Sequence, residues 1–291
     1  MGALVAERES QIVLGLDPDP ARLWPVATAA APADGSPAER AAAAVAAHCM
    51  AAIEAAGPAC VAVKPQLACF ERLGATGWAA LGHTVAHARD RGLLVLADGK
   101  RGDIDVSAAA YAQALAGETP TPFGAVRGLD ADAYTVSPYM GIDTLHALRA
   151  PGAGMFVLVR TSNPGAADVE DLATATGERV WERVARIVDG LGAPGPQTGL
   201  HDVGAVVGAT APEHLARARE LMPRTPFLLP GIGAQGGRVE HLAAAFAPGR
   251  AGGLVSASRS IVGAHEQRGG DPAEAARGEA ERLRALAWSL G

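Results

Sequence analysis

Short apolar segments recur along the chain and alternate with longer segments of helical spacing. The apolar segments are rich in Val and Leu and do not alternate with polar residues, which is typical of strands buried on both faces of a parallel sheet. They cover residues 12–16, 59–63, 93–97, 133–136, 154–159, 204–208, 227–229 and 252–255. The helical segments cover residues 38–56, 76–91, 106–116, 141–149, 177–190, 213–222, 238–246 and 272–288. This alternation predicts an α/β fold.

About eight strand–helix repeats at a spacing of roughly 35 residues favour a closed (β/α)8 TIM barrel. The length of 291 residues suits one such barrel, and no linker splits the chain. We therefore expect a single (β/α)8 barrel domain over residues 1–291. The alternative is an open, doubly wound sheet, and the absence of a G-x-G-x-x-G motif after the first predicted strand weakens it.

Helix starts and loops carry local signals. Ser36, followed by Pro37 and Glu39, predicts an N-cap. Thr210 resembles the first residue of a capping box with Glu213 at the third helical position. The Gly/Pro-rich segments 117–128, 162–168 and 191–202 predict loops.

Charge and composition exclude several classes of protein. The net charge is −6 and no basic stripe is present, so we expect no nucleic-acid partner, although one local pocket could still bind an anionic small molecule. The apolar stretch 41–53 is too short to span a bilayer, and the N-terminal segment lacks the pattern of a signal peptide. We expect a cytoplasmic protein without a membrane partner. The three cysteines are too few and too irregular for a disulfide framework or a zinc site.

Lysine is rare in this chain. Of 25 basic residues only Lys64 and Lys100 are lysines, and Asn163 is the only asparagine. Arginine is a planar fork that keeps its proton, whereas lysine is a compact charge whose pKa can shift. This scarcity suggests that arginine would fail at these two positions, with biased codon usage as the alternative explanation.

Polar residues follow the predicted strands, where barrel enzymes place their chemistry. Asp98 and Lys100 are two apart at the end of the third strand, so we expect both side chains to project into the barrel mouth. Asp103 lies further on and is less expected to share that direction. An ordinary salt-bridge cluster is the alternative. The other strand-end residues are Asp17, Lys64, Ser162, Pro230, Gly231, Gln235, Ser258 and Arg259.

The segments after the last two strands predict a phosphate site. Barrels often bind phosphate with these loops. Glycines at 231, 233, 236 and 237 let the backbone approach an anion closely, and Arg259 can hold phosphate oxygens in a bidentate manner.

The motif Asp98-x-Lys100-x-x-Asp103-Ile104 resembles the signature of the orotidine 5'-phosphate decarboxylase family. The resemblance extends along nearly the whole chain, and three of its segments look most like the longer bacterial branch, often called type 2. The similar segments are GLDPDP (15–20), VKPQLACFERLG (63–74), LADGKRGDI (96–104), SPYMG (137–141), TSNPGA (161–166), VVGATAP (206–212), PGIGAQGG (230–237) and SASRSI (256–261).

This resemblance implies decarboxylation of orotidine 5'-monophosphate to uridine 5'-monophosphate without a metal or other cofactor. It implies that Lys100 donates a proton and that Asp98 faces the substrate carboxylate. It also implies a homodimer in which Asp103 and Ile104 reach the partner's site. The remaining implied substrate contacts come from Asp17 and Lys64 (ribose), Ser162 (pyrimidine), Gln235, Ser258 and Arg259 (phosphate), Pro230 and Gly231 (closing loop), and Ser107.

Two positions depart from the family pattern, and two rival functions remain open. Asp105 stands where glycine is common, and Ser107 stands where threonine is usual.

The nearest rival is a Mg²⁺-dependent sugar-phosphate decarboxylase or aldolase of the same barrel superfamily, which shares the D-x-K-x-x-D motif. A non-catalytic nucleotide-binding barrel is the other. Arg160 could be either a structural ion-pair partner or a site residue.

Overall fold

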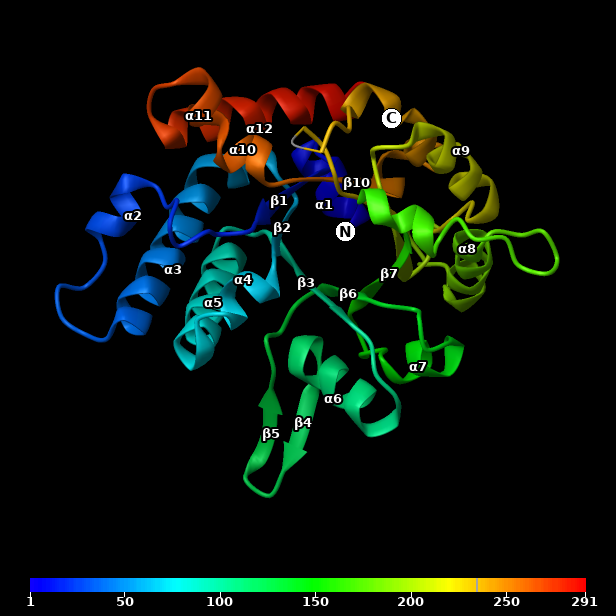
Figure 1. Ribbon diagram of the computed structural model, residues 1–291, viewed down its shortest axis with the longest axis horizontal. Helices are drawn as coiled ribbons and strands as arrows, with labels where there is room; N and C mark the ends of the chain where they lie inside the picture. The colour runs from blue at the N-terminus through cyan, green and yellow to red at the C-terminus, as the bar shows by residue number, and fades with distance from the viewer. Residues whose placement is uncertain (234) are drawn as a thin grey trace.

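The computed structural model describes residues 1–233 and 235–291, and eight of its strands form a closed parallel barrel (Figure 1). The order around the barrel is β1–β10–β9–β8–β7–β6–β3–β2. These strands are β1 (Ile12–Leu16), β2 (Ala62–Pro65), β3 (Leu94–Arg101), β6 (Ala133–Val136), β7 (Gly154–Arg160), β8 (Val203–Val207), β9 (Phe227–Leu229) and β10 (Gly253–Ala257). The prediction of a (β/α)8 barrel is confirmed, and the open sheet is excluded.

Helices surround the barrel, and their amphipathic faces cover the strands. The longer ones are α3 (Pro37–Ala56), α5 (Gly74–Asp90), α6 (Asp105–Ala116), α8 (Val180–Leu191), α9 (Pro212–Leu221) and α12 (Pro272–Trp288). The shorter ones are α1 (Gly2–Arg8), α2 (Pro25–Ala29), α4 (Leu67–Glu71), α7 (Ile142–Ala147), α10 (Arg259–Val262) and α11 (Ala264–Arg268). All the predicted helices except 238–246 occur as α-helices.

Side chains pack in two layers because successive residues of a strand point to opposite faces. Val157 and Tyr134 belong to the large core between the strands and the helices. Phe156, Val206 and Leu254 belong to a smaller core inside the barrel. The interior is therefore filled by side chains, and polar residues reach it mainly at the strand ends.

Ser36 caps α3 as predicted. Its hydroxyl accepts the Glu39 backbone N–H, and the Glu39 carboxylate accepts the Ser36 N–H, which completes a capping box. The prediction for Thr210 is wrong, because the N-cap of α9 is Ala211 and no side chain caps the helix. The Thr210 hydroxyl instead donates to the Ser162 carbonyl at 3.4 Å.

Two predicted segments have a different structure. Segment 238–246 forms two short 3-10 helices, Val239–His241 and Ala243–Phe246, rather than one α-helix. The buried Arg219 guanidinium donates to the carbonyls of Ala244 and Ala245, which gives these oxygens a partner outside a helix. Segment 117–128 was predicted as a loop, but it contains the antiparallel hairpin of β4 (Glu118–Thr121) and β5 (Gly124–Arg127).

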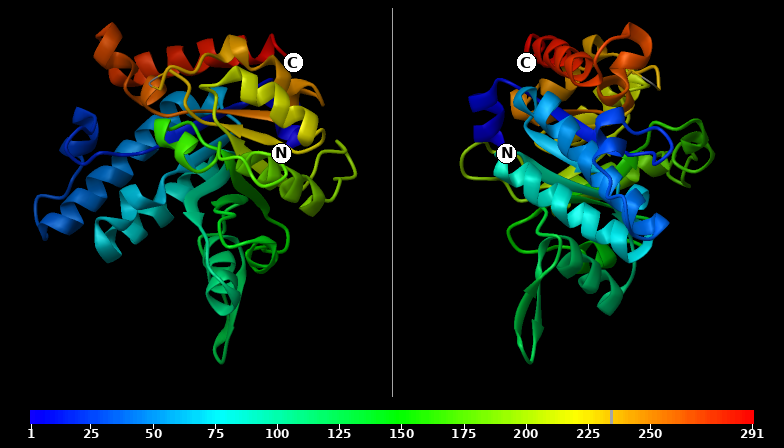
Figure 2. Two further views of the ribbon diagram at one scale, coloured as in Figure 1. Left: turned by 45° about the vertical axis from the view of Figure 1, so that its right-hand side comes forward. Right: turned by 90° about the vertical axis from the view of Figure 1, so that its left-hand side faces the viewer.

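The β4–β5 hairpin extends away from the barrel in both views of Figure 2. Almost all of its residues are exposed, so it lacks the buried apolar positions that make a strand visible in a sequence.

Helix α3 and the turn after it form a longer apolar segment than the stretch 41–53. Residues Pro37–Ala59 are long and apolar enough to cross a membrane by length and composition, because the helix extends beyond the 41–53 stretch at both ends. However, 61% of its most apolar window is buried inside the protein. This burial is typical of a core helix that packs against a barrel.

Candidate active site

Ten of the thirteen predicted site residues line one cavity of about 510 Å³ at the C-terminal ends of the barrel strands. They come from segments that are far apart in the sequence, and the closed barrel brings them together. The ten residues are Asp17, Lys64, Asp98, Lys100, Ser162, Pro230, Gly231, Gln235, Ser258 and Arg259.

A carboxylate between two lysines forms the charged centre of this cavity. The Lys64 Nζ donates to Asp98 Oδ2 at 2.6 Å, and the Lys100 Nζ donates to Asp98 Oδ1 at 2.6 Å. The Lys64 and Asp98 side chains are 8% and 7% exposed, whereas the Lys100 side chain is 45% exposed. Lys100 is therefore the more accessible lysine of this cluster. The two rare lysines of the sequence share one carboxylate.

The charges in this cluster stabilise one another. Burial raises the pKa of the Asp98 carboxyl, but Lys64 and Lys100 outweigh that effect and hold the pKa well below its usual range. Burial likewise lowers the pKa of the Lys64 amine, while Asp98 and Asp17 more than offset it, so this pKa lies above its ordinary value. At neutral pH, Asp98 is therefore a carboxylate and Lys64 an ammonium.

The side chains of Asp98 and Lys100 reach the same cavity, but the strand backbone that carries them is less regular than the sequence predicts. The pairing register between β3 and β6 shifts between Ala97 and Arg101. Lys100 has φ = 47°, in the left-handed region that non-glycine residues seldom adopt. The two side chains converge although the strand is irregular between them.

The opposite side of the cavity carries the residues predicted for phosphate. Arg259 is the first residue of α10, and Ser258 is its N-cap. Gly231 has φ = 102°, and a side chain there would lie 3.0 Å from Gln235 Oε1 and 3.2 Å from Ser162 Cβ. The Ser162 hydroxyl donates to Gln235 Oε1 at 2.6 Å, which joins the loop after β9 to the loop after β7. The Arg259 guanidinium, together with the polar side chains of these two loops, can bind an anion here.

Three predicted residues, Asp103, Ile104 and Ser107, lie outside the lining of this cavity. Among the described residues, no ion pair joins Asp103 to either lysine, and its carboxylate accepts the Ile104 N–H at 2.8 Å. Ile104 is 55% exposed, and Ser107 is exposed. Asp105 has φ = 41°, a backbone conformation that glycine adopts more easily and that aspartate tolerates. The departure from glycine at this position therefore leaves the turn intact.

Two residues that contact Asp98 were missed by the sequence analysis. The Gln66 amide donates to Asp98 Oδ2 at 3.3 Å. The Thr135 hydroxyl donates to Asp98 Oδ1 at 2.8 Å and accepts the Lys100 backbone N–H at 2.9 Å. Thr135 lies inside the apolar strand segment 133–136. The only feature of the sequence that could have pointed to it is a hydroxyl at an inward-facing position of that strand. Gln66 lies within the family-like segment VKPQLACFERLG (63–74), but the resemblance gave it no role.

Arg160 belongs to a structural ion pair. Its guanidinium donates to both oxygens of Asp171, at 3.0 and 2.9 Å, and its side chain is only 12% exposed. This bidentate pair lies beside the loop that carries Ser162.

Within residues 1–233 and 235–291, no group of three or more His, Cys, Asp or Glu residues could hold a metal ion. The three cysteines are free thiols, of which Cys49 and Cys60 are buried.

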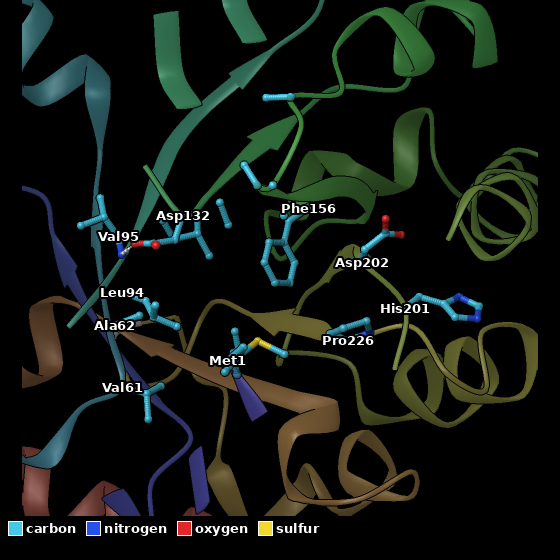
Figure 3. A pocket seen from close by; sticks show the side chains of 18 of the residues that line it. Met1, Val61, Ala62, Leu94, Val95, Asp132, Phe156, His201, Asp202 and Pro226 are labelled. Carbon is cyan, nitrogen blue, oxygen red and sulfur yellow. Dashed lines mark hydrogen bonds between the residues drawn. The ribbon is translucent and has the colours of Figure 1, made fainter. Parts of the chain in front are cut away.

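A larger cavity, about 660 Å³, lies at the opposite end of the barrel (Figure 3). Met1, Val61, Leu94 and Phe156 line it, and Phe156 projects into its centre. The charged residues on its wall are already paired, as in the 2.6 Å pair of Arg149 with Asp202. Although it is larger, it contains none of the predicted site residues, so the smaller cavity with the lysine–carboxylate cluster is the candidate active site.

A parallel barrel with charged groups gathered at the strand C-termini defines a (β/α)8-barrel enzyme. Residues 10–277 match the model of the "Orotidine 5'-phosphate decarboxylase / HUMPS family". The chain therefore belongs to this family, and within it to the carboxy-lyases that carry the first of these names. Their reaction is the decarboxylation of orotidine 5'-phosphate to uridine 5'-phosphate in pyrimidine biosynthesis.

Similar proteins support this placement. An orotidine 5'-phosphate decarboxylase from Deinococcus radiodurans is 47% identical over 218 residues, which cover 72% of this chain and 74% of that protein. One from Haloarcula marismortui is 41% identical over 265 residues, covering 90% and 85%. The structure of Leishmania donovani OMP decarboxylase has a TM-score of 0.71 and 33% identity, covering 98% of each chain. These matches do not favour the sugar-phosphate alternative.

Proposed function

We propose that this enzyme decarboxylates orotidine 5'-monophosphate without a cofactor and that Lys100 protonates the carbon from which CO₂ leaves. The observation that carries this proposal is the Lys64–Asp98–Lys100 cluster, in which the exposed ammonium of Lys100 faces the cavity. An ammonium is the one group here that can both stabilise a developing carbanion and supply a proton. An arginine would supply only the charge, because it does not give up its proton.

The substrate is expected to span the cavity. Arg259, Gln235 and Ser258 bind the 5'-phosphate, while Pro230 and Gly231 begin the loop that closes over it. Ser162 contacts the pyrimidine ring, and Asp17 and Lys64 contact the ribose hydroxyls. Since the phosphate lies far from the reacting carbon, its binding energy can drive closure rather than chemistry.

The chemical step then takes place beside Asp98. The bond between C6 and the carboxylate breaks, CO₂ leaves, and the electron pair remains on C6. Lys100 gives a proton from Nζ to C6, and water returns a proton to the resulting amine. Asp98 faces the departing carboxylate and disfavours the charged substrate more than a transition state from which that charge is leaving.

We further propose that the enzyme is a cytoplasmic homodimer. Asp103 lies outside the site of its own chain, and Ile104 next to it is exposed, as expected for residues that enter a partner's site. In such a dimer, Asp103 would supply a second carboxylate for Lys100, and Ser107 would face the same interface. Opposite charges within about 4–6 Å would keep the ammonium charged and oriented.

The deciding experiment follows the ultraviolet absorbance of orotidine 5'-monophosphate in the presence of EDTA. Wild-type protein should consume the substrate, and Lys100→Ala should lose at least about a thousandfold in kcat because it lacks both the charge and the proton. If the wild-type protein is inactive in EDTA but cleaves a sugar phosphate when Mg²⁺ is added, the chain is instead a Mg²⁺-dependent sugar-phosphate decarboxylase or aldolase. An active Lys100→Ala variant would remove Lys100 from its role.

A further inference from the structure

The Thr135 hydroxyl is buried against the charged cluster, although no part of the proposed reaction needs it directly. Thr135 lies on β6 and is 1% exposed. Its Oγ1 accepts the backbone N–H of Lys100 at 2.9 Å and donates to Asp98 Oδ1 at 2.8 Å. The same carboxylate oxygen accepts the Lys100 Nζ at 2.6 Å. The hydroxyl, the carboxylate and the lysine therefore form a closed ring of hydrogen bonds.

The backbone of Lys100 needs this acceptor because the strand is interrupted there. Leu96 and Ala97 pair with Ala133 and Tyr134, but the next paired residue of β3 is Arg101. A backbone N–H in such a bulge requires a partner from outside the regular ladder. Lys100 also has φ = 47°, a conformation that costs free energy and persists only where the surroundings hold it in place.

We propose that Thr135 is a positioning residue that holds Lys100 and Asp98 in the arrangement required for proton transfer. This inference rests on the proposed function of Lys100 as proton donor. A hydroxyl is suited to the role because it accepts from the lysine backbone and donates to the carboxylate at the same time. Valine has the same shape and can do neither. Serine can do both.

Three variants separate positioning from packing. In Thr135→Val, kcat should fall at least about tenfold while KM stays within about twofold, because the donor is misplaced but the binding groups remain. Thr135→Ser keeps the hydroxyl and should return kcat to within about threefold of wild type. Thr84→Val is the matched control, since Thr84 on α5 is equally buried and its hydroxyl donates to the Ala80 carbonyl far from the site. It should leave kcat and KM unchanged.

The two lysines provide a readout that is independent of activity. Protein labelled with isotopic lysine should give two side-chain resonances, from Lys64 and Lys100, and Lys100→Ala assigns them by removing one. Thr135→Val should shift the Lys100 resonance, whereas Thr84→Val and Thr135→Ser should leave it in place.

Several outcomes would overturn the inference. One is an unchanged kcat in Thr135→Val; another is an equal loss in Thr135→Ser, which would assign the effect to the methyl group. An unmoved Lys100 resonance in Thr135→Val would also overturn the inference, because Thr135 would then not position Lys100. If wild-type protein fails to consume orotidine 5'-monophosphate, the proposed function fails, and the lysine spectrum alone then decides whether Thr135 positions Lys100.

Discussion

Asp98 is the residue around which the site is organised. It accepts hydrogen bonds from Lys64, Gln66, Lys100 and Thr135, and it is almost fully buried. A carboxylate in this position costs desolvation energy that only its partners can offset. Removing it would leave the buried Lys64 ammonium without its hydrogen-bonded ion-pair partner. The cluster is therefore coupled to stability as well as to chemistry.

Asp98→Asn should lower the free energy of unfolding at pH 7 by about 3 kcal/mol or more, because it breaks a buried ion pair. The pKa of Asp98 is lower in the folded protein than in the unfolded chain. Its stabilisation is therefore fully present above the unfolded value near 3.8 and is lost as the pH falls through the lower folded value. Urea denaturation at pH 7 and pH 5.5 should give the same difference between wild type and variant.

The exposed pair of Arg22 with Glu266 provides the control for this measurement. Its side chains are 65% and 47% exposed, and such pairs contribute about 0–1 kcal/mol. Glu266→Gln should therefore cost much less than Asp98→Asn. Equal losses, or a more stable Asp98→Asn variant, would contradict a stabilising role for the buried cluster.

The sequence predicts residues of rare type better than it predicts their supporting neighbours. Lys64 and Lys100 were identifiable because the chain uses arginine almost everywhere else. Thr135 was not identifiable, because threonine inside an apolar strand is ordinary and its function depends on a bulge in the neighbouring strand. The direction of a side chain beyond a regular strand end depends on tertiary contacts that periodicity does not contain.

At the scale of elements, the apolar segments predicted all eight barrel strands because each strand is buried on both faces. Elements without that burial were missed or misassigned. The β4–β5 hairpin exposes nearly all of its residues. Segment 238–246 has helical composition, but two of its carbonyls are bound by Arg219 instead. Tertiary hydrogen bonds here override local propensity.

Arg259, the first residue of α10, gives a prediction about the phosphate-binding loops. Arg259→Ala should lower kcat/KM for orotidine 5'-monophosphate by about tenfold to a hundredfold, since a charge-assisted hydrogen bond is lost. Lost loop closure would increase this effect. Orotidine without its phosphate should be processed slowly but equally by wild type and variant. Steady-state kinetics on both substrates make the comparison.

Arg250→Ala is the matched control for Arg259→Ala. Arg250 stacks on Trp288 at 3.8 Å and lines a different cavity, so its removal should leave both substrates unaffected. If Arg259→Ala lowered kcat/KM equally for orotidine and its phosphate, Arg259 would act on the ring or the fold instead of the phosphate.

At the scale of the whole molecule, exposed apolar side chains are concentrated in the segment of the chain that contains α6, the β4–β5 hairpin and the start of α7. Of the twelve large apolar residues that are exposed in the described part of the chain, seven fall between residues 104 and 142. They are Ile104, Val106, Phe123, Val126, Tyr139, Met140 and Ile142. Such concentrations are typical of interaction surfaces. Asp103 adjoins this surface, which supports a dimer whose two sites lie at the interface.

A dimer of this kind makes a quantitative prediction about mixed subunits. If Asp103 acts in the partner's site, one site of the dimer contains Lys100 of one chain and Asp103 of the other. Lys100→Ala and Asp103→Ala should each be strongly impaired alone. When the two variants are mixed and allowed to exchange subunits, half of the dimers are hybrids, and each hybrid has one site with both residues intact. Activity should therefore rise to about a quarter of the wild-type value, as the two-fold symmetry requires.

The recovered activity should appear at the rate of subunit exchange and should depend on protein concentration. A mixture of Lys100→Ala with Asp98→Asn is the control, because Asp98 pairs with Lys100 of its own chain and each variant chain then damages its own site. In a hybrid of these two variants, one site lacks Lys100 and the other lacks the Asp98 carboxylate, so neither site is intact. Mixing Lys100→Ala with Asp98→Asn should therefore restore no activity. The double variant Lys100→Ala/Asp103→Ala gives a second test when it is mixed with wild type. If Asp103 acts in the partner's site, both sites of each hybrid are damaged, and activity should fall to about a quarter of the wild-type value instead of a half. A fall to only a half would place Asp103 in the site of its own chain.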